Sequence, residues 1–187
     1  MPLTVRRHVA RLLAAATLLL AQGVLADDKA AIVADAQRAL VDLRAHASGA
    51  GQLLDKAVGV LVYPKVVKVG FGGGAEYGEG CLLVDGKPVA FYTTSGADYG
   101  LPLGARSKSE VVLFMTPQAL QAFRDVQSWK VGVDGEVALV RVAAGGAVSA
   151  GEPVLGFVFS DQGLESELTL AGATFAQALG WQGAEVN

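Results

Sequence analysis

The side chains that could carry out chemistry in this sequence are few and widely spaced. Glu76 and Glu79 could act as a general acid and base, but their three-residue spacing places them on opposite faces of a strand. His46 is the only histidine after residue 26, and no His, Cys or carboxylate cluster has metal-ligand spacing. Cys81 lies in an apolar run and is expected to be a buried small hydrophobe. We therefore predict no catalytic residue and no metal site, and we interpret the chain as a non-enzyme.

One Gly-rich segment matches a cofactor fingerprint in its letters but not in its context. Residues 70–75 read Gly-Phe-Gly-Gly-Gly-Ala and fit the dinucleotide pattern G-x-G-x-x-A. That pattern holds a pyrophosphate when its glycines lead into a helix N-terminus. Here residues 76–80 are too rich in Gly for a helix and lead into a strand-like run. We predict a glycine-bent β segment and no cofactor.

Cations lie beside this segment. Lys65 and Lys68 are three residues apart, and Lys56 precedes them, whereas residues 142–187 contain five acids and no Lys or Arg. Arg106 and Lys108 form a second small basic group. Ordinary solvated lysines are the alternative, but we predict a basic rim for an anionic lipid headgroup, in which each charge contributes on the order of 1 kcal/mol.

The N-terminus predicts export. Three arginines precede an apolar run over residues 12–21 that is too short to span a bilayer, and Val24-Leu-Ala26 fits a cleavage site. We expect a signal peptide over residues 1–26 and a periplasmic or secreted mature protein. Cleavage would change the formal net charge from −3 to −6, because the segment holds three Arg and no acid. An acidic mature chain argues against nucleic acid as a partner.

Residue spacing then predicts the elements that position these side chains. A helix is expected over residues 27–46, with Ile32, Ala36, Ala39, Leu40, Leu43 and Ala47 on one face. Another turn of helix should follow over residues 52–56. A second helix should begin at the Thr116 cap and run to Asp125, with Leu120 and Phe123 facing inward.

The β pattern begins at Gly59 and is expected to pause where Pro64 ends the apolar run 59–63. Asp85-Gly86 predicts a type I′ hairpin turn, a device that Asp134-Gly135 and Gly145-Gly146 could repeat. Clustered glycines predict bulges, bends or close backbone approach. Further strands are expected near residues 131–133, 136–142, 153–160 and 165–171.

Together these elements predict an α+β fold. We expect a bent, mostly antiparallel β-sheet with the N-terminal helix and one further short helix packed on it. We predict one domain over residues 27–187, with an N-terminal helix region over 27–51 and a β-rich core over 52–175.

Several blocks resemble the SYLF domain, also described as the yeast actin-binding or DUF500 domain. They occur in order from about residue 52 to 173: Gly59-Val-Leu-Val-Tyr-Pro-Lys65, Lys68-Val-Gly-Phe-Gly-Gly-Gly74, Glu76-Tyr-Gly-Glu-Gly80, Tyr92-Thr-Thr-Ser-Gly96, Asp98-Tyr-Gly100, Phe114-Met-Thr116, Trp129-Lys-Val-Gly132, Gly156-Phe-Val-Phe159 and Gly163-Leu164. The resemblance implies a lipid-binding module, in which the Lys65 and Lys68 motif and the first helix, carrying Arg38 and Arg44, are candidate lipid contacts. Bacterial members of this family look like exported or envelope-associated proteins.

The leading hypothesis is therefore a non-catalytic exported module that recognises anionic phospholipid headgroups at the cell envelope. The alternative is an envelope structural or adaptor protein that binds another protein through its acidic C-terminal part. A third reading is an enzyme that acts on an envelope component through Glu76 or Glu79.

Overall fold

The protein is described here by a computed structural model that covers residues 28–69, 74–97, 107–140, 151–160, 163–164 and 170–178. The predicted signal peptide lies outside these residues, as does the Gly145-Gly146 pair. Within them, no helix combines the length and apolar character needed to cross a membrane.

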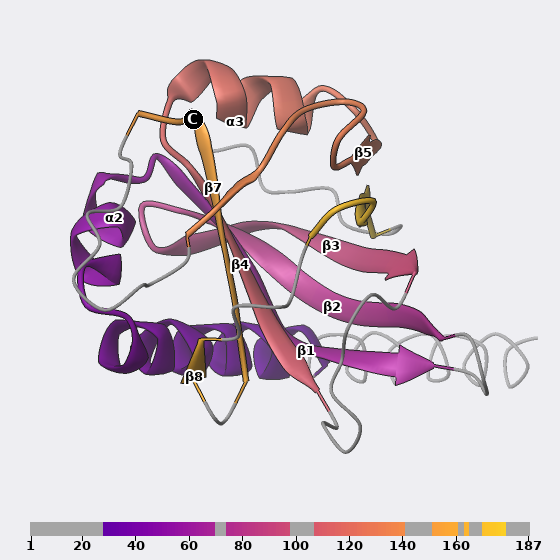
Figure 1. Cartoon of the computed structure of the whole chain (residues 1–187), viewed down its shortest axis with the longest axis horizontal. Coiled ribbons are helices and arrows are strands. Elements are labelled where there is room, and N and C mark those ends of the chain that lie inside the picture. Colours follow the sequence, from indigo (N-terminus) through magenta and orange to yellow (C-terminus); the bar gives the residue numbers. More distant parts are fainter. Residues whose placement is uncertain are drawn as a thin grey trace, which may run out of the picture.

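The described strands join one sheet, and the fold is α+β as the sequence predicted (Figure 1). The sheet order is β5-β9-β3-β2-β1-β4-β7-β6, with β8 also paired to β7. All strand pairs are antiparallel except β6 with β7. The strands are β1 (Gly59–Val69), β2 (Ala75–Val84), β3 (Lys87–Ala97), β4 (Lys108–Phe114), β5 (Ser128–Lys130), β6 (Ala138–Leu139), β7 (Val154–Ser160), β8 (Gly163–Leu164) and β9 (Thr174–Gln177).

Helices cover the two faces of this sheet, and Figure 1 shows them on opposite sides of the strands. The N-terminal helix (residues 28–46) is followed by α2 (Ala50–Lys56), and α3 (Pro117–Arg124) lies across the sheet from both. The predicted Thr116 cap is confirmed, because its side chain accepts a hydrogen bond from the backbone N–H of Ala119. The bounds of the first two helices agree with the pattern read from the sequence.

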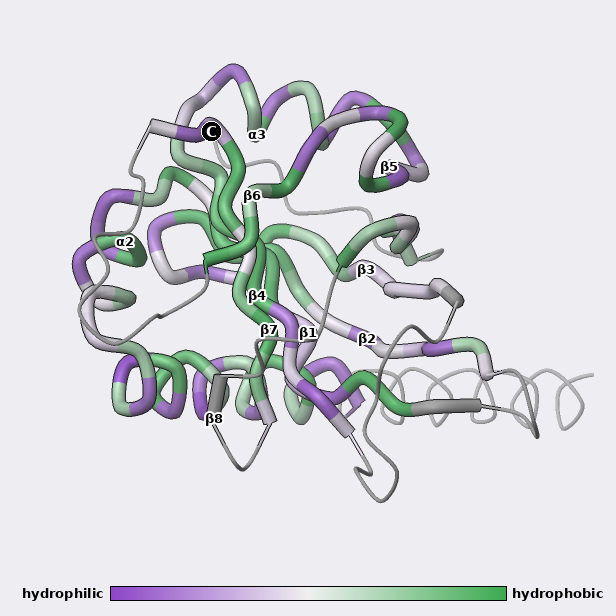
Figure 2. The backbone as a smooth tube through the Cα atoms, in the orientation of Figure 1, coloured by the Kyte–Doolittle hydropathy of each residue, from purple (hydrophilic) through white to green (hydrophobic). Residues whose placement is uncertain are grey.

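Each face of the sheet carries its own core. On the N-terminal-helix face, Ala36, Ala39 and Leu43 are buried against strand residues such as Val111 and Phe157. The predicted helix face is thus confirmed, since Ile32 and Leu40 also pack against this core. On the α3 face, the core includes Leu61, Tyr63, Val112, Phe114, Phe123, Trp129 and Phe175. Figure 2 shows apolar stretches along β1, β4 and β7, where these two cores meet the sheet. Each fully buried large side chain contributes about 1.5–3 kcal/mol.

The central strand β1 contains a bulge at Pro64. The expectation that the strand ends before Pro64 is wrong, because β1 continues to Val69. Its register shifts between Val62 and Lys65 against β2, and between Tyr63 and Val66 against β4. A bulge is where a central strand can accept a residue that has no N–H to donate. Gly80 of β2 lies against the bulge, where a Cβ would come within 2.1 Å of the Val62 carbonyl oxygen. The predicted close backbone approach is confirmed at this glycine.

Of the predicted hairpin turns, one is confirmed and one is wrong. Asp85 and Gly86 both have positive φ, at 51° and 73°, and join β2 to β3 as the predicted type I′ turn. Asp134-Gly135 does not join two strands of a hairpin, because β5 pairs with β9 and β6 pairs with β7. The positive φ in that segment belongs to Gly132.

The later strands were predicted unevenly. The run 153–160 is confirmed as β7, whereas residues 131–133 form a bridge and turn and not a strand. Of the run 136–142, only Ala138–Leu139 is a strand among the described residues. Most of the run 165–171 lies outside them. Strands β4, β5, β8 and β9 were not predicted. Of these, β5, β8 and β9 are too short to show a periodic pattern.

Candidate functional site

The two lysines of the predicted rim do not share a face of the sheet. After the bulge, β1 pairs with β2 in regular register, with Lys65 opposite Glu79 and Lys68 opposite Glu76. Side chains alternate along a strand, so positions 65 and 68 belong to opposite faces. The burial pattern agrees, since Lys65 is exposed and the next residue, Val66, is fully buried. The side chain of Lys68 lies outside the described residues. The register therefore does not support one continuous basic rim.

Lys108 is not a surface cation, which corrects its predicted place in a basic group with Arg106. Its side chain is 1% exposed, and its ammonium lies 2.6 Å from Glu76 Oε2 and 3.1 Å from Glu110 Oε1. Lys108 is the first residue of β4, and its side chain is buried on the α3 face of the sheet. Arg106 itself lies outside the described residues. The sequence did not reveal that two carboxylates enclose this lysine.

The remaining predicted cations are scattered over the surface. Arg38 pairs with Asp35 one turn earlier on the N-terminal helix. Arg44 Nη2 lies 2.9 Å from Asp55 Oδ1, which ties that helix to α2. Lys56 is exposed in the last turn of α2. Surface pairs of this kind contribute little to stability, and they leave Arg38 and Arg44 engaged with acids.

The structure instead brings four residues together on the α3 face, which we call the buried charge cluster: Glu76, Thr94, Lys108 and Glu110. Three strands supply them, and β1 lies between β2 and β4, so the Glu76–Lys108 pair crosses over β1. Glu110 Oε2 accepts a hydrogen bond from Thr94 Oγ1 at 3.3 Å. Glu76 Oε1 is buried and has no hydrogen-bond partner among the residues that the structure describes.

Burial and charge act in opposite directions on the pKa values in this cluster. Burial raises the pKa of the Glu110 carboxyl, and the Lys108 ammonium offsets part of that rise. Burial would by itself lower the pKa of Lys108, but the Glu110 and Glu76 carboxylates outweigh it and the pKa is raised overall. The lysine is therefore held as a cation between its two acids.

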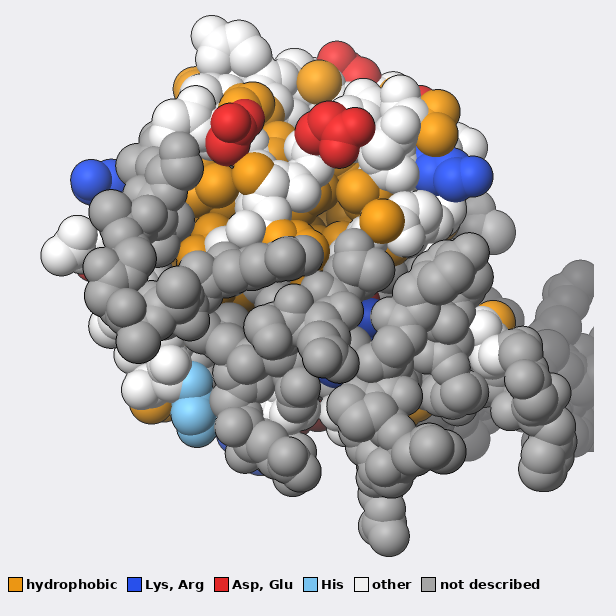
Figure 3. Space-filling view, in the orientation of Figure 1, with side chains coloured by type: hydrophobic (Ala, Val, Ile, Leu, Met, Phe, Trp, Pro, Cys, Tyr) orange, Lys and Arg blue, Asp and Glu red, His pale blue; other side chains and the backbone are white. Residues whose placement is uncertain are grey.

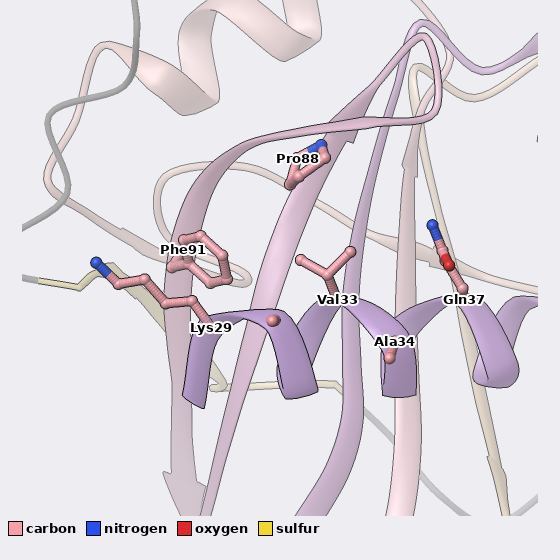
Figure 4. Close-up of a pocket in the computed structure, with 7 residues that line it drawn as sticks. Lys29, Val33, Ala34, Gln37, Pro88 and Phe91 are labelled. Carbon is pink, nitrogen blue, oxygen red and sulfur yellow. The ribbon is translucent and has the colours of Figure 1, made fainter. Parts of the chain in front are cut away.

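A second feature is an apolar groove between the N-terminal helix and β3, which we call the helix–β3 groove (Figure 4). It has a volume of about 380 Å³. Its lining consists of Lys29, Ala30, Val33, Ala34, Gln37, Pro88 and Phe91. The Lys29 ammonium lies 5.8 Å from the centroid of the Phe91 ring. An apolar floor thus lies directly beside a cation, a combination the sequence reading did not identify because helix and strand are far apart in sequence.

The other candidate chemical groups are not combined into a reactive site. Cys81 is fully buried, and burial raises the pKa of its thiol to about 12. Glu79 is exposed, and its Oε1 accepts a hydrogen bond from the Tyr77 hydroxyl. It lies on the face of β2 opposite Glu76, as predicted. His46 Nδ1 lies 2.8 Å from the Asp42 carbonyl oxygen on its own helix. Over the described part of the chain, no three His, Cys, Asp or Glu residues are grouped to hold a metal ion.

Comparison with known proteins adds no assignment. No protein-family model matches the sequence, and a search of curated proteins finds no match.

Proposed function

We propose that the chain is a non-catalytic, exported module that binds anionic phospholipid at a membrane surface. The observation that carries this proposal is the helix–β3 groove, which places apolar walls next to a lysine. The SYLF-like sequence blocks support the same class of ligand. The groove replaces the Lys65 and Lys68 rim as the proposed lipid site, because those two positions belong to opposite faces.

We propose that the groove binds the end of one lipid acyl chain. Val33, Pro88 and Phe91 offer apolar contact, and each methylene buried there contributes about 0.8 kcal/mol. Lys29 lies at the groove, where its charge attracts an anionic surface. Lys65 is exposed elsewhere and would add only a general electrostatic attraction of about 1 kcal/mol.

Vesicle co-sedimentation tests the proposal. Purified protein is mixed with vesicles of phosphatidylglycerol and phosphatidylcholine, and with phosphatidylcholine alone, at low and high salt. We expect binding to the anionic vesicles that weakens with salt. Val33→Asp should reduce binding at least fivefold, because it places a charge in the apolar groove.

Val41→Asp is the matched control, because Val41 lies on the same helix with 65% of its surface exposed and does not line the groove. Ala34→Trp fills the groove without adding charge and should also weaken binding. Thermal melting of each variant verifies that the helix still packs. Equal binding by the Val33, Ala34 and Val41 variants would refute the groove, and no binding at low salt would refute the function.

The alternative is an envelope structural or adaptor protein that binds a protein partner through its acidic C-terminal part. Of the five acids in residues 142–187, only Glu152 is described, and it is exposed. The described upper part of the face in Figure 3 shows acidic groups among hydrophobic side chains. A partner captured from envelope extracts by wild-type protein, and lost when Glu152, Glu165 and Glu167 are all changed to Gln, would favour this alternative.

A further inference from the structure

The helix–β3 groove has a polar side chain at each end and an apolar part between them (Figure 4). Lys29, Val33 and Gln37 are four residues apart, so they follow one side of the helix over about 12 Å at 1.5 Å per residue. Across from them, Pro88 and Phe91 of β3 form the other wall. A chain-shaped apolar ligand laid along the helix would therefore match the long axis of the groove.

The volume of the groove limits the size of that ligand. A cavity of about 150 Å³ holds a benzene ring. In proportion, the groove's volume of about 380 Å³ holds at most roughly fifteen non-hydrogen atoms. One chain of about ten to twelve carbons with a compact head group stays within this limit, whereas two acyl chains exceed it.

The charge of the groove selects the head group. Lys29 is the one charged side chain among the described residues that line the groove, and none of these residues is acidic. Its ammonium lies 5.8 Å from the centroid of the Phe91 ring, so the charge lies directly beside apolar contact. An anionic head group is attracted to this position, whereas a cationic one is repelled. A single carboxylate matches a single ammonium in both charge and size.

From this we infer that the helix–β3 groove also binds an unesterified fatty acid of about ten to twelve carbons, with its carboxylate at Lys29 and its chain running toward Gln37. The inference goes beyond membrane binding, but it rests on the proposed function for the assignment of the groove to lipid. Ala30, Ala34 and Gln37 are exposed, so the groove is open to solvent and the ligand enters without movement of the helix. Such a ligand is taken up from water as a single molecule and needs no bilayer.

A series of chain lengths tests the size limit. Titration calorimetry is carried out with octanoate, decanoate, dodecanoate and tetradecanoate, below the concentrations at which they form micelles. We expect saturable binding whose affinity rises about twofold to fourfold per added methylene up to about twelve carbons and then levels off. An affinity that rises at the same rate to tetradecanoate would indicate adsorption to an unbounded apolar surface and would overturn the inference.

A change of head group and a change of Lys29 test the role of charge. Decyltrimethylammonium should bind at least tenfold more weakly than decanoate, and decanol should lie between them. Lys29→Met should weaken decanoate binding about fivefold, which is the contribution of one surface charge, and should leave decanol binding unchanged. Lys130→Met removes an exposed lysine from β5 and is the matched control, which should bind as wild type does. Equal losses for decanoate and decanol in Lys29→Met would show that this lysine acts only through packing and would overturn the inference.

A blocked groove and the vesicle assay separate fatty-acid binding from membrane binding. Ala34→Trp places a large ring in the groove from an exposed position and should abolish dodecanoate binding, with thermal melting as the check that the variant folds. Dodecanoate binding without vesicle binding would support the inference and refute the membrane function. Vesicle binding without dodecanoate binding would overturn the inference and leave the membrane function in place.

Two other occupants of the groove give different results. A lysophospholipid that binds more tightly than a fatty acid of equal chain length would identify a phospholipid as the ligand taken from solution. A dimer that Ala34→Trp prevents, together with no fatty-acid binding, would identify a second copy of this chain. Either result would overturn the inference.

Discussion

Replacing Lys108 with Met removes the one ammonium that the described residues place in the buried charge cluster, while it keeps a side chain of similar length. Two carboxylates would then remain buried, with Glu76 92% and Glu110 98% covered. Breaking a buried ion pair by removing one partner costs about 3–5 kcal/mol. At roughly 2–4 °C per kcal/mol for a chain of this size, the Tm should fall by about 6–20 °C.

Differential scanning calorimetry of Lys108→Met at pH 7 measures this loss. Lys65→Met is the control, since Lys65 is exposed on the neighbouring strand and its loss should change stability by no more than about 0.5 kcal/mol. Adding Glu76→Gln and Glu110→Gln to Lys108→Met should restore most of the stability, because no unpaired charge then remains. A Tm within about 2 °C of wild type for Lys108→Met would refute this electrostatic account.

Three further predictions follow from burial and close contact. Burial raises the pKa of Glu110, so wild type gains stability as pH falls toward the unfolded pKa of about 4.3. Glu110→Gln lacks this gain, so its stability relative to wild type in urea unfolding should decrease as pH is lowered from 7 toward that value. Gly80→Ala should cost about 1–3 kcal/mol, because its Cβ would meet the Val62 carbonyl oxygen, whereas Gly151→Ala meets no atom within 4 Å and should melt as wild type does. Cys81, with a pKa of about 12, should resist iodoacetamide at pH 8 until the protein is unfolded.

The features that could be predicted from the sequence are those decided within a few residues. Asp85-Gly86 forms the expected turn because its backbone preference does not depend on distant contacts. Thr116 caps α3 for the same reason, since its hydroxyl reaches an N–H three residues later. The buried side of the N-terminal helix could also be predicted, because its apolar residues recur at helical spacing.

The candidate site depended on the order of strands, which the sequence pattern does not reveal. Lys108 and Glu110 are two residues apart, so the sequence predicts that they share a face of the strand. It does not predict whether that face is buried. Their third partner, Glu76, comes from a strand two positions away in the sheet. The bulge at Pro64 shifts the register of β1, so the faces of the residues that follow could not be counted from residue 59.

Strand β9 lies between β3 and β5 although it is the last described strand in the chain. During translation, the outer edge of β3 and the short β5 are made long before Thr174–Gln177 leaves the ribosome. Until then, a nascent chain exposes an unpaired strand edge beside Tyr92, which invites association between chains. Completion of the sheet therefore waits for the C-terminal part, and a chain that stops early would have a lasting tendency to aggregate.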